Sequence, residues 1–184
     1  MNRIRVESGV YHCISRANGR LFLLDRPDAK ERFVAMLGKV SAFCSMEVLS
    51  FCVMGNHFHV LAREVPVPAE GFDDAELERR LHLLYEPSKA RILFANQQAW
   101  RRRGDGARAD RIREGYRRMT GDVSWFMRLL KQRFSVWYNR THGREGTLWS
   151  ERFRSVAVED SEEAVLAMAA YIDLNPVRAG MVED

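Results

Sequence analysis

Residues 46–65 read MEVLSFCVMGNHFHVLAREV, and this stretch decides the fold. It begins with a nearly continuous apolar run at residues 46–54, and a second β-forming run follows at residues 57–65. Gly55 and Asn56 lie between the two runs, where such a pair favours a two-residue hairpin turn. The stretch therefore predicts two antiparallel strands joined by a tight turn.

The segments on either side of this hairpin complete a split β-α-β arrangement. Residues 9–17 are rich in β-forming side chains, and residues 25–44 carry apolar side chains at helical spacing after a candidate capping residue, Asp25. Residues 122–143 carry a second apolar helical stripe, and residues 147–158 alternate as a strand does. This order predicts a ferredoxin-like sandwich, a four-stranded antiparallel sheet with two helices on one face.

A further helix is expected after the last strand. Asp160 and Glu163 form a start like a capping box, and Pro176 is expected to end the helix, because the residue before a proline is pushed out of the helical region. The fold class is thus α+β, with an appended C-terminal helix. The second face of the sheet is expected to be free for function.

Residues 66–121 interrupt the pattern and are interpreted as an insertion in a single domain that spans residues 1–184. The insertion contains prolines, an acidic block and an arginine-rich run at residues 101–118. That run is either a solvated face or a segment that contacts phosphates, and charge patterning alone leaves both open. One short helix is predicted from the spacing of Leu77, Leu81 and Leu84.

Composition excludes several classes of protein. The chain has 184 residues, 46% of them apolar and 29% charged, which suits one packed core and excludes a disordered or fibrous chain. The apolar runs are too short for a membrane helix and residues 1–8 lack the apolar stretch of a signal peptide, so a cytoplasmic protein is expected. The net charge of +4 points to an anionic partner. Buried thiols are expected at Cys13, Cys44 and Cys52, because their spacing suits neither disulfides nor zinc.

His57 and His59 flank Phe58 on the second strand of the hairpin. Because strand side chains alternate, both imidazoles point to one face of the sheet. Two imidazoles on one face can hold one metal ion, but two histidines on a half-exposed strand give the same pattern. His12 could lie on the same face, either as a functional residue or as a packed, hydrogen-bonded one.

Tyr171 and Asn175 stand four residues apart on the last expected helix and so face the same way. A tyrosine can attack a DNA phosphate and form a phosphotyrosine ester, and the asparagine amide oxygen could join two histidines in a metal site. The alternative is an aromatic core residue followed by an asparagine that caps the helix end. Only the combination with His57 and His59 favours the catalytic interpretation.

Four motifs follow one another along the chain: VYHCISR at residues 10–16, MGNHFHVL at 54–61, WSERFR at 149–154 and YIDLNPVRAG at 171–180. Together they resemble the single-tyrosine HUH transposases, specifically the branch associated with repetitive extragenic palindromes (REPs). The resemblance covers most of the chain outside the insertion. It implies a ferredoxin-like nuclease that nicks single-stranded DNA beside a hairpin and leaves a 5′-phosphotyrosine and a free 3′-hydroxyl.

The resemblance also implies roles for single residues. Tyr171 would be the nucleophile, and His57, His59 and Asn175 would hold a divalent metal ion, Mg²⁺ or Mn²⁺. Gly55 stands where many relatives have proline, which is expected to loosen the hairpin turn. Contacts to the REP-like hairpin DNA and its flanking tetranucleotide are expected from Arg16, Asn18, Arg20, Lys131, Arg152, Arg154 and Arg178.

Three functions compete at this stage. The first is a metal-dependent, single-stranded DNA endonuclease and strand transferase of transposase type. The second is a catalytically idle module that binds hairpin or single-stranded DNA on the same fold. The third is a phosphodiesterase that uses metal-activated water. A bacterial cytoplasmic protein associated with the nucleoid is expected, as monomer or homodimer, with Trp125, Phe126 and Trp137 in its core.

Overall fold

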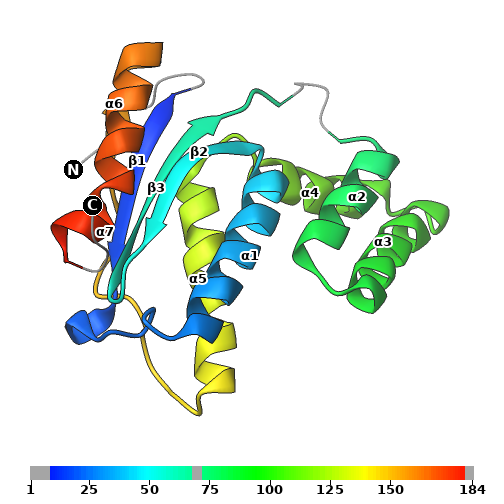
Figure 1. Cartoon of the computed structure of the whole chain (residues 1–184). Coiled ribbons are helices and arrows are strands. Elements are labelled where there is room, and N and C mark those ends of the chain that lie inside the picture. Colours follow the sequence, from blue (N-terminus) through cyan, green and yellow to red (C-terminus); the bar gives the residue numbers. More distant parts are fainter. Residues whose placement is uncertain (1–8, 68–71, 181–184) are drawn as a thin grey trace.

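A four-stranded antiparallel sheet forms the centre of the molecule in the computed structural model, which describes residues 9–67 and 72–180 (Figure 1). The strand order is β2-β3-β1-β4, the ferredoxin-like order that the sequence predicted. The strands are β1 (Val10–Arg16), β2 (Met46–Val53), β3 (His57–Glu64) and β4 (Arg154–Val158).

Two helices, α1 (Pro27–Cys44) and α5 (Val123–Thr141), cover one face of this sheet, as predicted (Figure 1). Fully buried Phe33 of α1 lies between Phe58 and Phe134, with ring centroids 4.6 Å and 5.3 Å away. Full burial of each such ring contributes about 1.5–3 kcal/mol. This aromatic layer holds both helices against the sheet. The expected capping by Asp25 is wrong, because the cap residue of α1 is Arg26, which makes no capping bond through its side chain.

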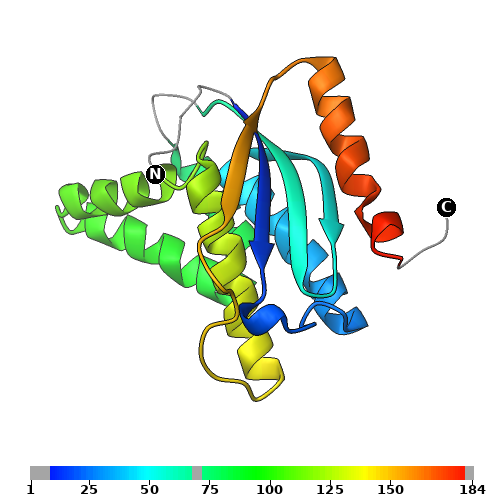
Figure 2. The ribbon, with the colours of Figure 1, turned by 90° about the vertical axis from the view of Figure 1, so that its left-hand side faces the viewer.

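The other face of the sheet is not free, which corrects the sequence-based expectation. Helix α6 (Glu162–Asp173) lies across it, and the short α7 (Asn175–Arg178) follows (Figure 2). Ile172 is fully buried on this face with Val10 and Leu61. This packing removes the apolar stripe of α6 from water, which stabilises the helix on the sheet. The side chain of Ser161, and not Asp160, caps the helix by accepting from the Ala164 amide.

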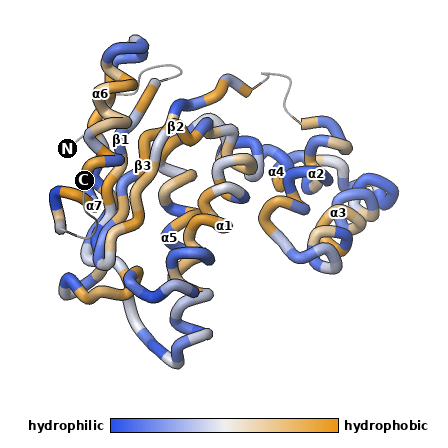
Figure 3. Tube along the Cα trace, viewed as in Figure 1, coloured by the Kyte–Doolittle hydropathy of each residue, from blue (hydrophilic) through white to orange (hydrophobic). Residues whose placement is uncertain are grey.

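The insertion folds as three helices and not as the single short helix expected from the sequence. They are α2 (Asp74–Leu84), α3 (Pro87–Arg102) and α4 (Gly106–Arg117), and they project from the helical side of the sandwich (Figures 1 and 2). Figure 3 shows α4 as mostly hydrophilic, and its one buried residue is Ala109. Both ends of the insertion meet the end of α1, since Val65 N donates to Ser45 O and Gly121 N to Cys44 O.

The last strand is shorter than expected. Only residues 154–158 of the predicted 147–158 pair with β1, and Trp149 makes one isolated bridge to Ala17. Trp149 instead turns its ring into the core, 5.4 Å from Phe58, while its indole Nε1 donates to Lys131 O. The loop over residues 147–153 is therefore held by this buried side chain and by two backbone hydrogen bonds, from Asn18 N to Leu148 O and from Ser150 N to Arg16 O.

Two other expectations concern cysteines and membranes. Cys13, Cys44 and Cys52 are free and buried, as predicted. Within residues 9–67 and 72–180, no helix is long and apolar enough to cross a membrane. Residues 1–8, for which no signal peptide is expected, lie outside the described residues.

Candidate active site

A cluster of three histidines lies on the sheet face that α6 covers. In the antiparallel register Arg16 pairs with His57 and Ile14 with His59, so His57 and His59 point to one face, and His12 joins them from β1. The His59 ring lies 5.1 Å from the His57 ring and 5.2 Å from the His12 ring, measured between centroids. His12 thus belongs to the cluster, which the sequence left open.

The histidines are kept neutral by their surroundings. Burial lowers the pKa of His59 to about 4, helped by the charge of Arg16 and by the repulsion that protonated His12 or His57 would add. Burial, and then the charge of Arg16, lowers the pKa of His57 as well. His12 Nε2 and His59 Nδ1 share a hydrogen bond of 2.9 Å. Neutral imidazoles keep a lone pair, which is the form that ligates metal ions.

Asn56 fixes the proton of His57. The amide Nδ2 of Asn56 donates to the carbonyl of Arg20, so the amide oxygen faces His57 Nδ1 at 2.7 Å. Because that oxygen can only accept, Nδ1 of the neutral His57 carries the proton and Nε2 carries the lone pair. Such partners of the second ring nitrogen are what orient metal-ligating histidines in proteins.

Helix α6 brings Tyr171 to the histidines. The Tyr171 ring lies edge-on to the rings of His12 and His59, at 6.1 Å and 6.5 Å between centroids. The guanidinium of Arg178 lies over the same tyrosine ring at 5.1 Å. Tyr171 is 41% exposed, so a ligand can reach it. Tyr171 and His59, predicted from separate motifs, are therefore neighbours in space.

Asn175 caps the end of α6. Its amide Nδ2 donates to the carbonyls of Tyr171 and Ile172, at 3.0 Å and 3.2 Å. The sequence had offered this capping role as the alternative to a metal ligand. The helix ends at Asp173, before the end expected at Pro176. The amide oxygen of Asn175 accepts no hydrogen bond from any residue that the structure describes. Asn175 can therefore cap the helix and still offer an oxygen to a ligand.

The donor atoms suit a divalent metal ion. Among the described residues, no group of three or more His, Cys, Asp or Glu side chains is arranged to hold a metal ion. His57 and His59 offer neutral imidazoles, and Asn175, at the end of the helix that carries Tyr171, offers an amide oxygen. Mixed nitrogen and oxygen donors of this kind fit divalent ions that also bind phosphate.

Comparison with known proteins relates the chain to two solved structures. No protein-family model matches it, and neither does any curated protein. A REP-associated tyrosine transposase bound to a REP hairpin superimposes with a TM-score of 0.59 at 16% identity, over 100% of this chain and 75% of that one. The two chains share a fold. A candidate transposase of Deinococcus radiodurans R1 gives a TM-score of 0.45 at 14% identity, over 94% of this chain and 95% of that one.

Several residues expected to contact DNA surround the histidines. Arg16 is exposed, and its charge acts on His57 and His59. Arg154 lies opposite Ile14 and so projects from the histidine face, where it pairs with Glu151 at 3.0 Å. Asn18 and Arg20 form the short turn η1 (Asn18–Arg20) after β1, and the carbonyl of Arg20 accepts a hydrogen bond from Asn56 Nδ2.

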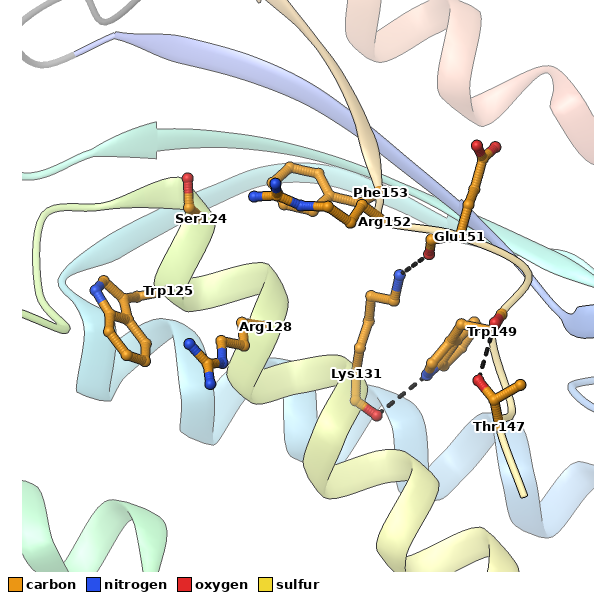
Figure 4. Close-up of a pocket in the computed structure, with 9 residues that line it drawn as sticks. All are labelled: Ser124, Trp125, Arg128, Lys131, Thr147, Trp149, Glu151, Arg152 and Phe153. Carbon is orange, nitrogen blue, oxygen red and sulfur yellow. Dashed lines mark hydrogen bonds between the residues drawn. The ribbon is translucent and has the colours of Figure 1, made fainter. Parts of the chain in front are cut away.

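Lys131 and Arg152 lie elsewhere, around a pocket between α5 and the loop over residues 147–153 (Figure 4). Lys131 is only 9% exposed and donates to the carbonyl of Glu151, and burial lowers its pKa to about 8. Trp125 lines the same pocket, so its expected place in the core is wrong. Phe126 is fully buried and Trp137 packs against the core, as predicted.

The hairpin turn is not loosened by Gly55, contrary to expectation. Met54 N donates to His57 O across the turn, Gly55 O accepts from Leu24 N, and Asn56 O accepts from Ala17 N. A Cβ atom on Gly55 would lie 2.7 Å from the ring of Phe22. The turn is thus held firmly by residues 17–24, and glycine gives Phe22 room to pack on it.

Proposed function

We propose that the chain is a metal-dependent endonuclease and strand transferase of single-stranded DNA, of the REP-associated tyrosine transposase family, with Tyr171 as its nucleophile. The observation that carries this proposal is the position of Tyr171, edge-on to His12 and His59 across three separate elements. The fold shared with a REP-associated tyrosine transposase supports it. If Tyr171 served only to pack α6, a cluster of histidines beside its ring would not be needed.

The proposed reaction is a transesterification. The phenolic oxygen of Tyr171 loses its proton and attacks the phosphorus in line, and the bond from phosphorus to the 3′-oxygen breaks. The 3′-oxygen leaves with a proton as a free hydroxyl, and the 5′-phosphate stays on the tyrosine. The new ester keeps the energy of the broken linkage, so another 3′-hydroxyl can displace Tyr171 without ATP. The guanidinium of Arg178 stabilises negative charge near the tyrosine.

Each surrounding residue has a part in this proposal. His57, His59 and Asn175 would hold Mg²⁺ or Mn²⁺, which polarises the scissile phosphate and offsets its charge when bound. Asn56 keeps the His57 proton on Nδ1, away from the ion. The hydrogen bond with His12 orients the ring of His59 in the same way.

The proposed substrate is hairpin-bearing single-stranded DNA, because the fold neighbour was solved with a REP hairpin. The basic side chains around the histidines suit a phosphate backbone, with Arg16 and Arg154 in reach of the strand beside the scissile linkage. Such a substrate implies action on bacterial DNA at the nucleoid. The proposed form is a monomer or a homodimer.

A nicking assay tests the proposal. Purified protein is incubated with labelled hairpin-bearing DNA from beside its own gene, with Mg²⁺ or Mn²⁺, and the products are separated on a denaturing gel. The wild type is expected to nick the DNA only with metal, and Tyr171→Phe to bind it without nicking. Tyr85→Phe, in the insertion, is the matched control and is expected to nick normally.

The other two functions give different results in the same assay. Nicking by Tyr171→Phe would identify water as the nucleophile and contradict the role of the tyrosine. Tight binding without nicking, with both metals and several hairpins, would identify an idle binding module. Either result overturns the proposal.

A further inference from the structure

A pocket of about 650 Å³ lies beside the edge of the sheet and outside the histidine cluster (Figure 4). Trp125, Arg128 and Lys131 line it from α5, and Trp149, Arg152 and Phe153 line it from the loop before β4. A volume of this order is within the usual range for small-molecule sites, about 300–1,000 Å³. Nothing in the proposed reaction uses this pocket.

The pocket combines aromatic rings with positive charge. The guanidinium of Arg128 lies over the Trp125 ring at 4.8 Å, and the Lys131 ammonium lies 5.6 Å from the Trp149 ring. The carboxylate of Glu151 points away from the pocket in Figure 4 and pairs with Arg154. The lining therefore offers flat apolar faces and cations, without a carboxylate aimed inward. A ligand that fits has a flat ring and an anionic group.

A nucleotide of single-stranded DNA has this chemistry. Aromatic side chains bind unpaired bases by stacking, which tolerates any base because every base has a π face. The neighbouring phosphates then meet arginines, which bind phosphate with paired donors. A base within a duplex is already stacked and could not enter such a pocket. The match therefore favours an unpaired base.

The pocket is also connected to the histidine face. β4 is an edge strand, and the loop that lines the pocket continues directly into it. Arg154 projects from the histidine face opposite Ile14, and Ile14 pairs with His59 on its other side. Arg152 at the pocket and Arg154 on the histidine face thus stand two residues apart on one segment. A DNA strand that crosses this edge would meet one cation and then the other.

We infer that this pocket holds an unpaired nucleobase of the DNA strand that leads over β4 to the histidine face. Trp125 is the stacking platform, and Arg128 and Arg152 bind the adjoining phosphates. This inference rests on the proposed function for the identity of the ligand as DNA. It adds a binding site for the bases that flank the reacting phosphate.

The test compares two fluorescein-labelled probes, single-stranded oligo(dT) and an oligonucleotide of the same length built from abasic nucleotides. Both carry the same phosphates, so only the bases differ. Without metal, the wild type is expected to bind oligo(dT) about tenfold more tightly, the effect of stacking one base. Trp125→Ala is expected to lose this preference, and Trp125→Phe to keep most of it.

Trp100→Ala is the matched control. Trp100 is also half-buried and lies under an arginine, Arg108, at 4.5 Å, but it belongs to the insertion. This variant is expected to keep the full preference for oligo(dT). Thermal melting of each variant shows whether it is folded. Photocrosslinking of wild-type protein to 5-iododeoxyuridine DNA gives a second reading that needs no substitution, with the crosslink expected on Trp125.

The outcomes separate this inference from the proposed function. Three results would contradict the inference. They are equal affinity of the wild type for both probes, a preference retained by Trp125→Ala, and a crosslink confined to another part of the chain. These experiments use no hairpin, no metal and no reaction at Tyr171. A base preference without nicking would therefore support the pocket and contradict the transesterase, and nicking without a base preference would do the reverse.

Discussion

Arginines in the insertion and arginines around the histidine face look alike in the sequence but differ in the folded chain. In the insertion, Glu76 binds Arg79 and Arg80, and Glu114 binds Arg117 and Arg118. These arginines lower the pKa of each glutamate to about 2. Much of the basic charge of the insertion is therefore balanced within its own helices.

Outside the insertion, several arginines near the histidine face or around the pocket have no such partner. Within residues 9–67 and 72–180, neither Arg16, Arg20 nor Arg152 forms an ion pair. A cation without a carboxylate partner remains available for phosphate. The comparison shows that the number of arginines in a segment does not locate an anion site. An arginine that is already paired with a carboxylate, as Arg154 is with Glu151, is less available for phosphate than Arg16 or Arg152.

The largest expected effect follows removal of a histidine from the cluster. His59→Ala is expected to weaken metal binding roughly 100-fold or more, because it removes a proposed metal ligand together with its hydrogen bond to His12. Titration with Mn²⁺ followed by electron paramagnetic resonance measures the affinity. His82→Ala, at an exposed position in the insertion, serves as the control. If His59→Ala and His82→Ala lost the same metal affinity, the metal site would not lie specifically at the histidine cluster.

A second prediction concerns Asn56. Asn56→Ala removes the acceptor that keeps the proton on His57 Nδ1, so the ring is expected to populate both tautomers. Metal affinity should fall about 10- to 100-fold, as for other partners of metal-ligating histidines. The ¹⁵N chemical shifts of the His57 ring report the tautomer directly. Unchanged shifts, or the same change in Asn96→Ala of the insertion, would contradict the role of Asn56.

The pH dependence of stability should distinguish the two regions. The pKa of His59 is about 4 in the folded chain against 6.5 for the free side chain, so the unfolded chain binds more protons between these values. The free energy of unfolding is therefore undiminished by His59 above pH 6.5. It falls as the pH drops toward 4, by up to about 1.4 kcal/mol per pH unit.

The glutamates of the insertion act in a lower window. Their folded pKa of about 2, below the ordinary 4.5, gives stability that is lost only as the pH falls from about 4.5 toward 2. Urea unfolding between pH 7 and 4 should therefore show a slope that His59→Gln reduces and Glu76→Gln does not. A slope unaffected by His59→Gln would mean that His59 is not held neutral.

The smallest expected effect concerns the salt dependence of DNA binding. Replacing Arg16 and Arg152 together by alanine should reduce the slope of log affinity against log salt by about 1.4, since each phosphate contact to single-stranded DNA contributes about 0.7. Arg117 and Arg118, both paired with Glu114, are the matched pair in the insertion. Their double replacement should leave the slope unchanged. A larger effect there would place the DNA on the insertion.

Parts of the fold could be predicted because local patterns determine them. The turn at Gly55 and Asn56 joins two runs of β-forming residues, and the structure has the expected hairpin. The insertion was predicted less completely. In α3, Ala90, Leu93 and Phe94 stand at helical spacing but among many polar residues, and α4 buries only Ala109. Ion pairs such as Arg117 with Glu114, and packing around Leu77 and Ala90, stabilise these helices instead.

The candidate site was only partly predictable for a similar reason. Alternation along β3 places His57 and His59 on one face, and sequence alone gives that. The meeting of Tyr171 with the histidines depends on α6 packing across the sheet through Ile172, which is a long-range contact. Trp125 was assigned to the core because it is aromatic and lies on an apolar helix. Its arginine neighbour one turn later, Arg128, was the signal that could have suggested an exposed ring.

The central claim is that Tyr171 forms a covalent bond with DNA. Its most direct measurement is the intact mass of the protein after incubation with hairpin-bearing DNA and metal, followed by peptide mapping of the DNA-bound fraction. The account predicts a mass increase equal to the 5′-phosphorylated cleavage fragment, located on the peptide that contains Tyr171 and absent from Tyr171→Phe. Cleaved DNA without any change in protein mass, or an adduct on another residue, would contradict it.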